Sequence, residues 1–146
     1  MMKFTAKDPN YEARVRTSFE KQEAMKTVGA HLVNLSPGEV VIEFPYHQSL
    51  TQQNGYIHAG IVTTVVDSAC GYAAYTLMPA GSDVLSIEFK VNFMSPAKGE
   101  TFRAIGKVLK SGRTITVCTG HVVAIEKGKE TVVATMQATM ICLALN

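Results

Sequence analysis

The segment that most constrains the fold is residues 58–78, HAGIVTTVVDSACGYAAYTLM, which is rich in small residues and apolar around almost its whole circumference as a helix. A helix without a polar face is either buried in a protein core or embedded in a membrane. A membrane span would place Asp67 in hydrocarbon, and no basic residues flank the segment to anchor it. The segment therefore predicts a core helix on which a sheet packs at short distance.

The remaining sequence predicts one more helix and the strands of that sheet. Residues recurring at three- and four-residue steps predict an amphipathic helix that ends at Gly29, with one face formed by Tyr11, Val15, Phe19, Gln22 and Met25. Alternating patterns bounded by turn signals predict strands at 30–35, 39–46, 84–94, 101–109, 114–126 and 131–143. The last four strands are predicted to form a meander. The fold class is therefore α+β, with an antiparallel sheet wrapped around the core helix.

Length and composition limit the class of protein. A chain of 146 residues fits a single domain over residues 1–146. A net charge of +2 provides no general field for nucleic acid, so we expect no such partner. The cysteines lack a C-x-x-C pair and are expected to be reduced core residues of a cytoplasmic protein: Cys70, Cys118 and Cys142. The N-terminus has no apolar signal-peptide core. Three histidines, His31, His47 and His121, lack the spacing of metal ligands, so we expect no metal. We expect no cofactor either.

Asp67 is the first candidate for chemistry. Aspartate is unfavourable inside a helix, and a buried carboxylate needs a partner or a function. One interpretation is structural, with the carboxylate bonded to neighbouring backbone or threonine groups or facing solvent. The other is a general base held in a cavity.

The start of the same helix is the second candidate. The first N–H groups of a helix lack an intrahelical partner, and with the helix dipole they can hold a carbonyl oxygen on which charge develops. Small side chains at Ala59 and Gly60 let a ligand approach the backbone. The alternative is a plain helix start with glycine for packing.

Spacing then predicts an assembly. Ala59 and Asp67 are eight positions apart, which separates them by about 12 Å along a straight helix. A base and an oxyanion donor must both lie about 3 Å from one reacting group. If both act, the amide of one subunit must meet the carboxylate of another, as a two-fold dimer allows.

Two motifs together resemble a known family. His58-Ala59-Gly60 with Asp67 nine positions after the histidine, followed by 71–74 (GYAA) and 93–97 (FMSPA), is similar to the hotdog-fold thioesterases of the phenylacetic-acid-degradation type. These belong with the 4-hydroxybenzoyl-CoA thioesterases. The resemblance runs from about Phe19 to Leu143. It implies a hotdog fold: five to six antiparallel strands around a long central helix, plus the N-terminal amphipathic helix.

The resemblance also implies roles at the helix. Asp67 matches the family's base or nucleophile. The Ala59 amide matches the oxyanion donor, although the family usually has glycine there. Gln52 has the spacing of a residue that points at the carbonyl, and Asn54 is the alternative. His58 is expected to orient the helix start.

Further positions are implied for the substrate. Ser86 matches a hydroxyl that helps place the water, and Gly60 gives room beside the thioester. The CoA phosphates require cations, with Arg113 the best match and Lys90 another, among Lys90, Lys98, Lys107, Lys110 and Arg113. The acyl pocket is expected to be lined by Phe19, Met25, Tyr46 and Leu50.

The expected activity is hydrolysis of a small to medium aryl- or acyl-CoA to free acid and CoA. The expected partners are the acyl-CoA substrate and a second copy of the chain, in a homodimer that assembles into a homotetramer, without a membrane. Two other functions stay open: a non-catalytic acyl-CoA-binding hotdog module, and a hotdog dehydratase or hydratase.

Overall fold

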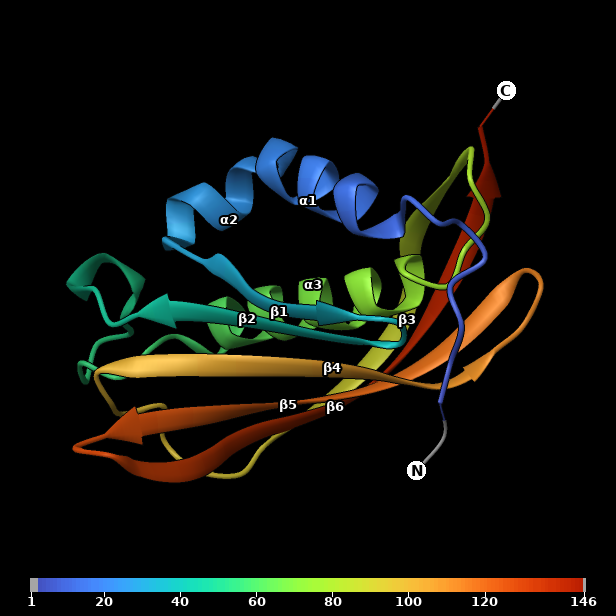
Figure 1. Cartoon of the computed structure of the whole chain (residues 1–146). Coiled ribbons are helices and arrows are strands. Elements are labelled where there is room, and N and C mark those ends of the chain that lie inside the picture. The colour runs from blue at the N-terminus through green and yellow to red at the C-terminus, as the bar shows by residue number, and fades with distance from the viewer. Residues whose placement is uncertain (1–2, 146) are drawn as a thin grey trace.

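A computed structural model describes residues 3–145 and has one antiparallel sheet curved around a central helix (Figure 1). The helical segments are α1 Tyr11–Lys21, α2 Glu23–Val28, the 3-10 turn η1 Gln48–Leu50 and α3 Ala59–Tyr75. The strands are β1 His31–Ser36, β2 Glu39–Pro45, β3 Ser82–Phe93, β4 Thr101–Ser111, β5 Ile115–Glu126 and β6 Lys129–Ala144. The six strands are ordered β1-β2-β4-β5-β6-β3. This confirms the six predicted strands, the core helix and the α+β class.

The order of the last four strands differs from the predicted meander. β3 pairs with β6 rather than with β4, and β4 pairs with β2. The segment between β3 and β4 therefore passes β6 and β5 to reach the middle of the sheet, and β3 becomes an edge strand. Alternation along a strand shows which residues face the core, but partners are selected by how the sheet closes around α3.

The N-terminal helix is broken, although the sequence predicts one continuous helix to Val28. α1 ends at Lys21 and α2 begins at Glu23, and Gln22 between them is extended, with φ −82° and ψ 96°. The predicted end at Gly29 is confirmed, since this residue takes the left-handed conformation with φ 77°. No proline or glycine lies at the break, so its cause is tertiary.

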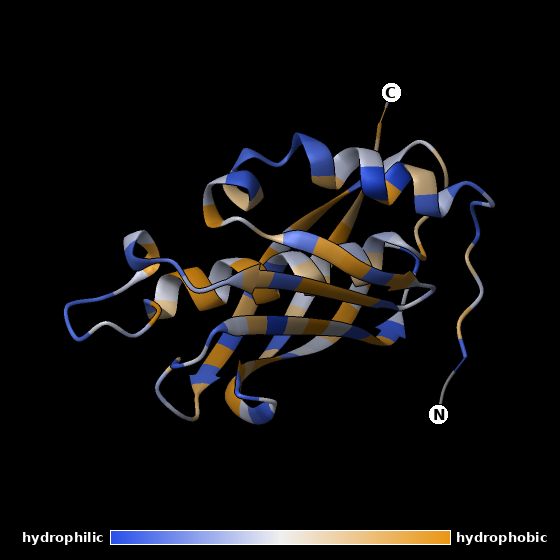
Figure 2. Ribbon diagram, turned by 60° about the vertical axis from the view of Figure 1, so that its left-hand side comes forward, coloured by the Kyte–Doolittle hydropathy of each residue, from blue (hydrophilic) through white to orange (hydrophobic). Residues whose placement is uncertain are grey.

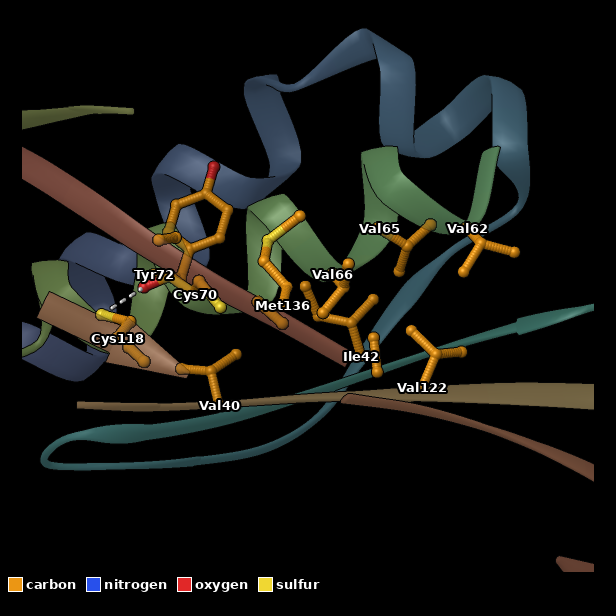
Figure 3. Close-up of a cluster of buried hydrophobic side chains, with 14 of the residues drawn as sticks. Val40, Ile42, Val62, Val65, Val66, Cys70, Tyr72, Cys118, Val122 and Met136 are labelled. Carbon is orange, nitrogen blue, oxygen red and sulfur yellow. Dashed lines mark hydrogen bonds between the residues drawn. The ribbon is translucent and has the colours of Figure 1, made fainter. Parts of the chain in front are cut away.

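Small residues let the sheet approach α3 closely, as predicted. A Cβ at Gly120 would lie 2.7 Å from Sγ of Cys70, and one at Gly106 would overlap the Ala69 carbonyl. Figure 3 shows the core between this helix and the strands, with Val65 and Val66 of α3 pointing toward Ile42 and Val122. Hydrophobic residues run along α3, whereas α1 is largely hydrophilic (Figure 2).

The helix has one side that the sheet does not cover. Thr63, Thr64, Asp67 and Ser68 are half-buried, while Val65, Val66, Ala69 and Cys70 are fully buried. The two threonine hydroxyls donate to the carbonyls of Ala59 and Gly60, which satisfies them within the helix. Among residues 3–145, no helix is long and apolar enough to cross a membrane.

Candidate active site

Asp67 lies in a polar cavity of about 330 Å³ between α1, α3 and the start of β3. Its Oδ1 accepts a hydrogen bond of 2.6 Å from the Ser86 hydroxyl, and Ser86 stands just before a bulge in β3. Within the described part of the chain, Oδ2 accepts no hydrogen bond. One carboxylate oxygen is thus fixed in orientation while the other is available to a substrate or a water.

The start of α3 offers one free amide. His58 caps the helix, with Nδ1 accepting from the Gly60 amide at 2.8 Å, and its carbonyl accepts from the amides of Ile61 and Val62. The His58 amide donates to Leu50. Across residues 3–145, the Ala59 N–H alone among these five amides has no acceptor. We expected several free amides at this helix start, and the structure leaves one. It is the amide at the position implied for the oxyanion donor.

Glycine at position 60 serves the cap. A Cβ there would lie 3.0 Å from Nδ1 of His58 and would displace the imidazole. The Gly60 amide is itself occupied by that imidazole, so its contribution to a site is space rather than a donor.

The Ala59 amide borders a second cavity, of about 470 Å³, which is mainly apolar. Gln52 lines it together with residues from the 93–97 segment, whereas Asn54 does not. The Gln52 Oε1 accepts from the Asn54 amide, which leaves the Gln52 side-chain NH2 as a donor. The two cavities, one around Asp67 and one around Ala59, share no lining residue.

A comparison with known proteins identifies the family. The model of the thioesterase superfamily matches residues 54–131, which is more than half of the chain. The chain belongs to the thioesterase superfamily. It is a thioester hydrolase, and the predicted hotdog fold is confirmed.

Solved structures and relatives that resemble this chain agree with this assignment. A thioesterase family protein from Silicibacter pomeroyi is 51% identical with a TM-score of 0.91, over 92% of this chain and 98% of that chain. Acyl-coenzyme A thioesterase 13 of Homo sapiens is 33% identical over 58% of this chain and 60% of its own length. The PaaI protein from the phenylacetic acid degradation operon of E. coli shares the fold, with a TM-score of 0.84 at 15% identity over 97% of this chain and 99% of that chain.

The cations implied for CoA lie away from both cavities of this thioesterase. Lys90 is exposed on the edge strand β3, opposite Gln137 of β6, and Arg113 is exposed in the turn between β4 and β5. Their roles stay predictions. In the described region, no three His, Cys, Asp or Glu side chains gather as metal ligands would.

The residues expected to line the acyl pocket lie elsewhere. Met25 and Leu50 are buried in the core, and the Phe19 ring packs edge-on against Tyr72. Tyr46 is exposed and its hydroxyl donates to the Gly55 carbonyl. None of these four lines either cavity.

Sequence reasoning missed four other polar side chains in the cavity of Asp67, which are Ser18, Gln22, Ser68 and Tyr72. The Gln22 amide accepts from the Ser68 hydroxyl at 2.8 Å and donates to the Tyr72 hydroxyl at 3.2 Å. Burial raises the pKa of Tyr72, which keeps this phenol neutral. The available signal was Gln22 itself, a primary amide on the apolar side of an amphipathic helix.

The two buried thiols are not nucleophiles here. Cys70 of α3 and Cys118 of β5 are free and buried between helix and sheet, and burial raises the pKa of Cys118 to about 12. The Cys118 thiol donates to the Cys70 carbonyl (Figure 3). Both are free core residues, as predicted, whereas Cys142 is free but only partly buried.

Proposed function

We propose that this thioesterase hydrolyses a small to medium aryl- or acyl-CoA to free acid and CoA, at two equivalent sites shared between the subunits of a homodimer. The observation that carries the proposal is the separation of the two functional groups. A free oxyanion donor at Ala59 and an oriented carboxylate at Asp67 stand in cavities that share no residue, about 12 Å apart along one helix.

The catalytic steps follow from the groups available. The thioester carbonyl oxygen accepts a hydrogen bond from the Ala59 amide, with the Gln52 NH2 as a second donor. Asp67 of the partner subunit removes a proton from water, and the hydroxide adds to the carbonyl carbon. The oxyanion is stabilised by the amide at the positive end of the helix dipole. The intermediate then collapses, which breaks the carbon–sulfur bond and releases CoA thiolate and the acid.

Asp67 can also attack directly. In that route a carboxylate oxygen forms an anhydride with the acyl group as CoA leaves, and water then hydrolyses the anhydride. The Ser86 hydrogen bond supports either route, because it orients the carboxylate through Oδ1 and leaves Oδ2 to react. A single turnover in H2-18O separates the routes: the general-base route puts the label into the released acid, whereas hydrolysis of the anhydride at the Asp67 carbon puts it into Asp67 and releases an unlabelled acid.

The dimer is supported by the surface beside Asp67. β3 is an edge strand and exposes large apolar side chains, with Leu85 56%, Ile87 52% and Phe89 42% exposed. An apolar, unpaired edge of this length is a liability unless another chain covers it. A second copy related by a two-fold axis covers this edge on both subunits at once.

The experiment is a thiol-release assay with short, aromatic and long acyl-CoAs on the wild type and Asp67→Asn. The asparagine keeps the shape and accepts from Ser86 but is neither base nor nucleophile. We expect hydrolysis by the wild type and a loss of several orders of magnitude in kcat for the variant. Wild-type rates for Asp67→Asn would refute the mechanism.

A further inference from the structure

The cavity that contains Asp67 is closed on one side by four connected polar side chains, named here the polar wall: Ser18, Gln22, Ser68 and Tyr72. Gln22 is its centre, bonded to Ser68 through Oε1 and to Tyr72 through Nε2. Ser18 joins through its hydroxyl, 3.2 Å from that of Tyr72. Each of the four is therefore held in place before any ligand binds.

The wall explains the break in the N-terminal helix. In a continuous helix the backbone of Gln22 would follow the axis of α1. The extended conformation at this residue instead places its side-chain amide against Ser68 and Tyr72 of α3. Interrupting a helix sacrifices backbone hydrogen bonds, and no proline or glycine requires it here. Both polar atoms of Gln22 gain partners beside the candidate carboxylate.

Unused hydrogen-bonding capacity remains on the wall. One N–H of the Gln22 amide has no acceptor within residues 3–145, and the Ser68 oxygen donates once but accepts nothing there. The Tyr72 oxygen accepts from Gln22 and keeps one lone pair when it donates to Ser18, so a ligand hydroxyl could accept from Gln22 and donate to Tyr72. An alkyl chain in the same place would leave these groups unpaired, and unpaired buried polar groups oppose binding.

Charge indicates which arm of the thioester enters this cavity. Its lining includes the carboxylates of Asp67 and Asp83 and contains no lysine or arginine. The CoA arm leads to a nucleotide with several phosphate charges, which this lining repels. The acyl arm carries no phosphate charge, so it is the arm that fits this cavity. An acyl chain that ends in an anionic group is disfavoured, because the lining carboxylates would repel it.

We propose that the polar wall recognises a neutral hydrogen-bonding group, such as a hydroxyl, on the far end of a short acyl chain, with Gln22 and Tyr72 as specificity-determining residues. This inference rests on the proposed acyl-CoA hydrolysis. Tyr72 follows Asp67 by five residues, or roughly 7–8 Å along the helix axis. An extended six-carbon acyl chain with a terminal hydroxyl spans a similar length.

The experiment compares kcat/KM for ω-hydroxyhexanoyl-CoA and hexanoyl-CoA, a pair that differs in one hydroxyl. For the wild type we expect the hydroxylated substrate to be favoured about tenfold, the size of a neutral hydrogen bond in a preformed site. Tyr72→Phe and Gln22→Leu should bring this ratio close to one. The matched control is Tyr11→Phe, which removes a hydroxyl far from the wall and should keep the wild-type ratio.

Each other result has a definite meaning. A wild type that hydrolyses both substrates equally, or prefers hexanoyl-CoA, overturns the inference and leaves acyl-CoA hydrolysis standing. Wall variants that lower kcat/KM equally for both substrates assign the wall to the pantetheine arm and also overturn it. A wild type that cleaves no acyl-CoA in the panel refutes the proposed function itself. Gln22→Leu decides the matter if Tyr72→Phe does not fold.

Discussion

Replacing Ala59 by proline removes one hydrogen-bond donor, the backbone N–H, and changes little else. Ala59 is the first residue of α3, a position where proline is favoured because its missing N–H would have no helical partner. The preceding residue must be extended, and His58 already has φ −59° and ψ 138°. The cap between His58 and the Gly60 amide is unaffected. The variant should therefore fold with its helix start intact.

The loss of activity follows from the role of the amide. Removing one oxyanion donor typically costs about 10²–10³ in kcat, or about 3–4 kcal/mol of transition-state stabilisation. We expect Ala59→Pro to lose this much in the thiol-release assay with an unchanged unfolding midpoint. Ala59→Gly, which retains the N–H, measures how much of the effect comes from the side chain. Near wild-type kcat in Ala59→Pro would refute the role of this amide.

Mixing two inactive variants tests where the site is assembled. Random exchange between Ala59→Pro and Asp67→Asn subunits makes half of the dimers mixed. In a shared-site dimer, each mixed dimer has one site with neither lesion, so the mixture should regain about a quarter of wild-type activity. If both groups served one site within a chain, every site would carry a lesion. Absence of recovery after demonstrated exchange would contradict the shared site.

Four further outcomes are expected. Ser86→Ala should lower kcat about ten- to hundredfold without unfolding, because a hydrogen bond to a charged carboxylate is worth about 1.5–3 kcal/mol; an unchanged kcat would remove Ser86 from the site. Gly106→Ala should destabilise by about 1–3 kcal/mol in denaturant unfolding, because the new Cβ overlaps the Ala69 backbone. Gly71→Ala, with no atom within 4 Å of its new Cβ, should instead be neutral or stabilising. With its pKa raised to about 12, the Cys118 thiol should resist a thiol reagent at pH 8 until the protein is unfolded; rapid labelling of the native protein would contradict its burial.

The core helix and the strands could be predicted because the order of polar and apolar residues indicates burial directly: a helix without a polar face is buried, and alternation shows which face of a strand is buried. The pairing of β3 with β6 could not, since alternation along a strand contains no information about its neighbour. The break at Gln22 was equally hidden, because the residues around it are ordinary helix formers. Its cause lies 46 positions away at Ser68 and 50 away at Tyr72.

At the candidate site, the spacing of Ala59 and Asp67 already required two subunits if both groups act. Choosing between Gln52 and Asn54 required the loop geometry, in which only Gln52 borders the cavity beside Ala59. The acyl-pocket expectation was wrong for Met25 and Leu50, because the apolar side chains of α2 and of the η1 turn pack into the core.

The sequence by itself determined the α+β fold class, the buried helix and an outlying carboxylate at Asp67, since all three depend on the local order of polar and apolar residues. The tertiary structure alone decided which helix amide stays free, which hydroxyl binds Asp67 and which polar residues surround it. Those contacts join residues 19 to 54 positions apart. Their geometry arises only when the sheet closes around α3 and α1 is laid across it.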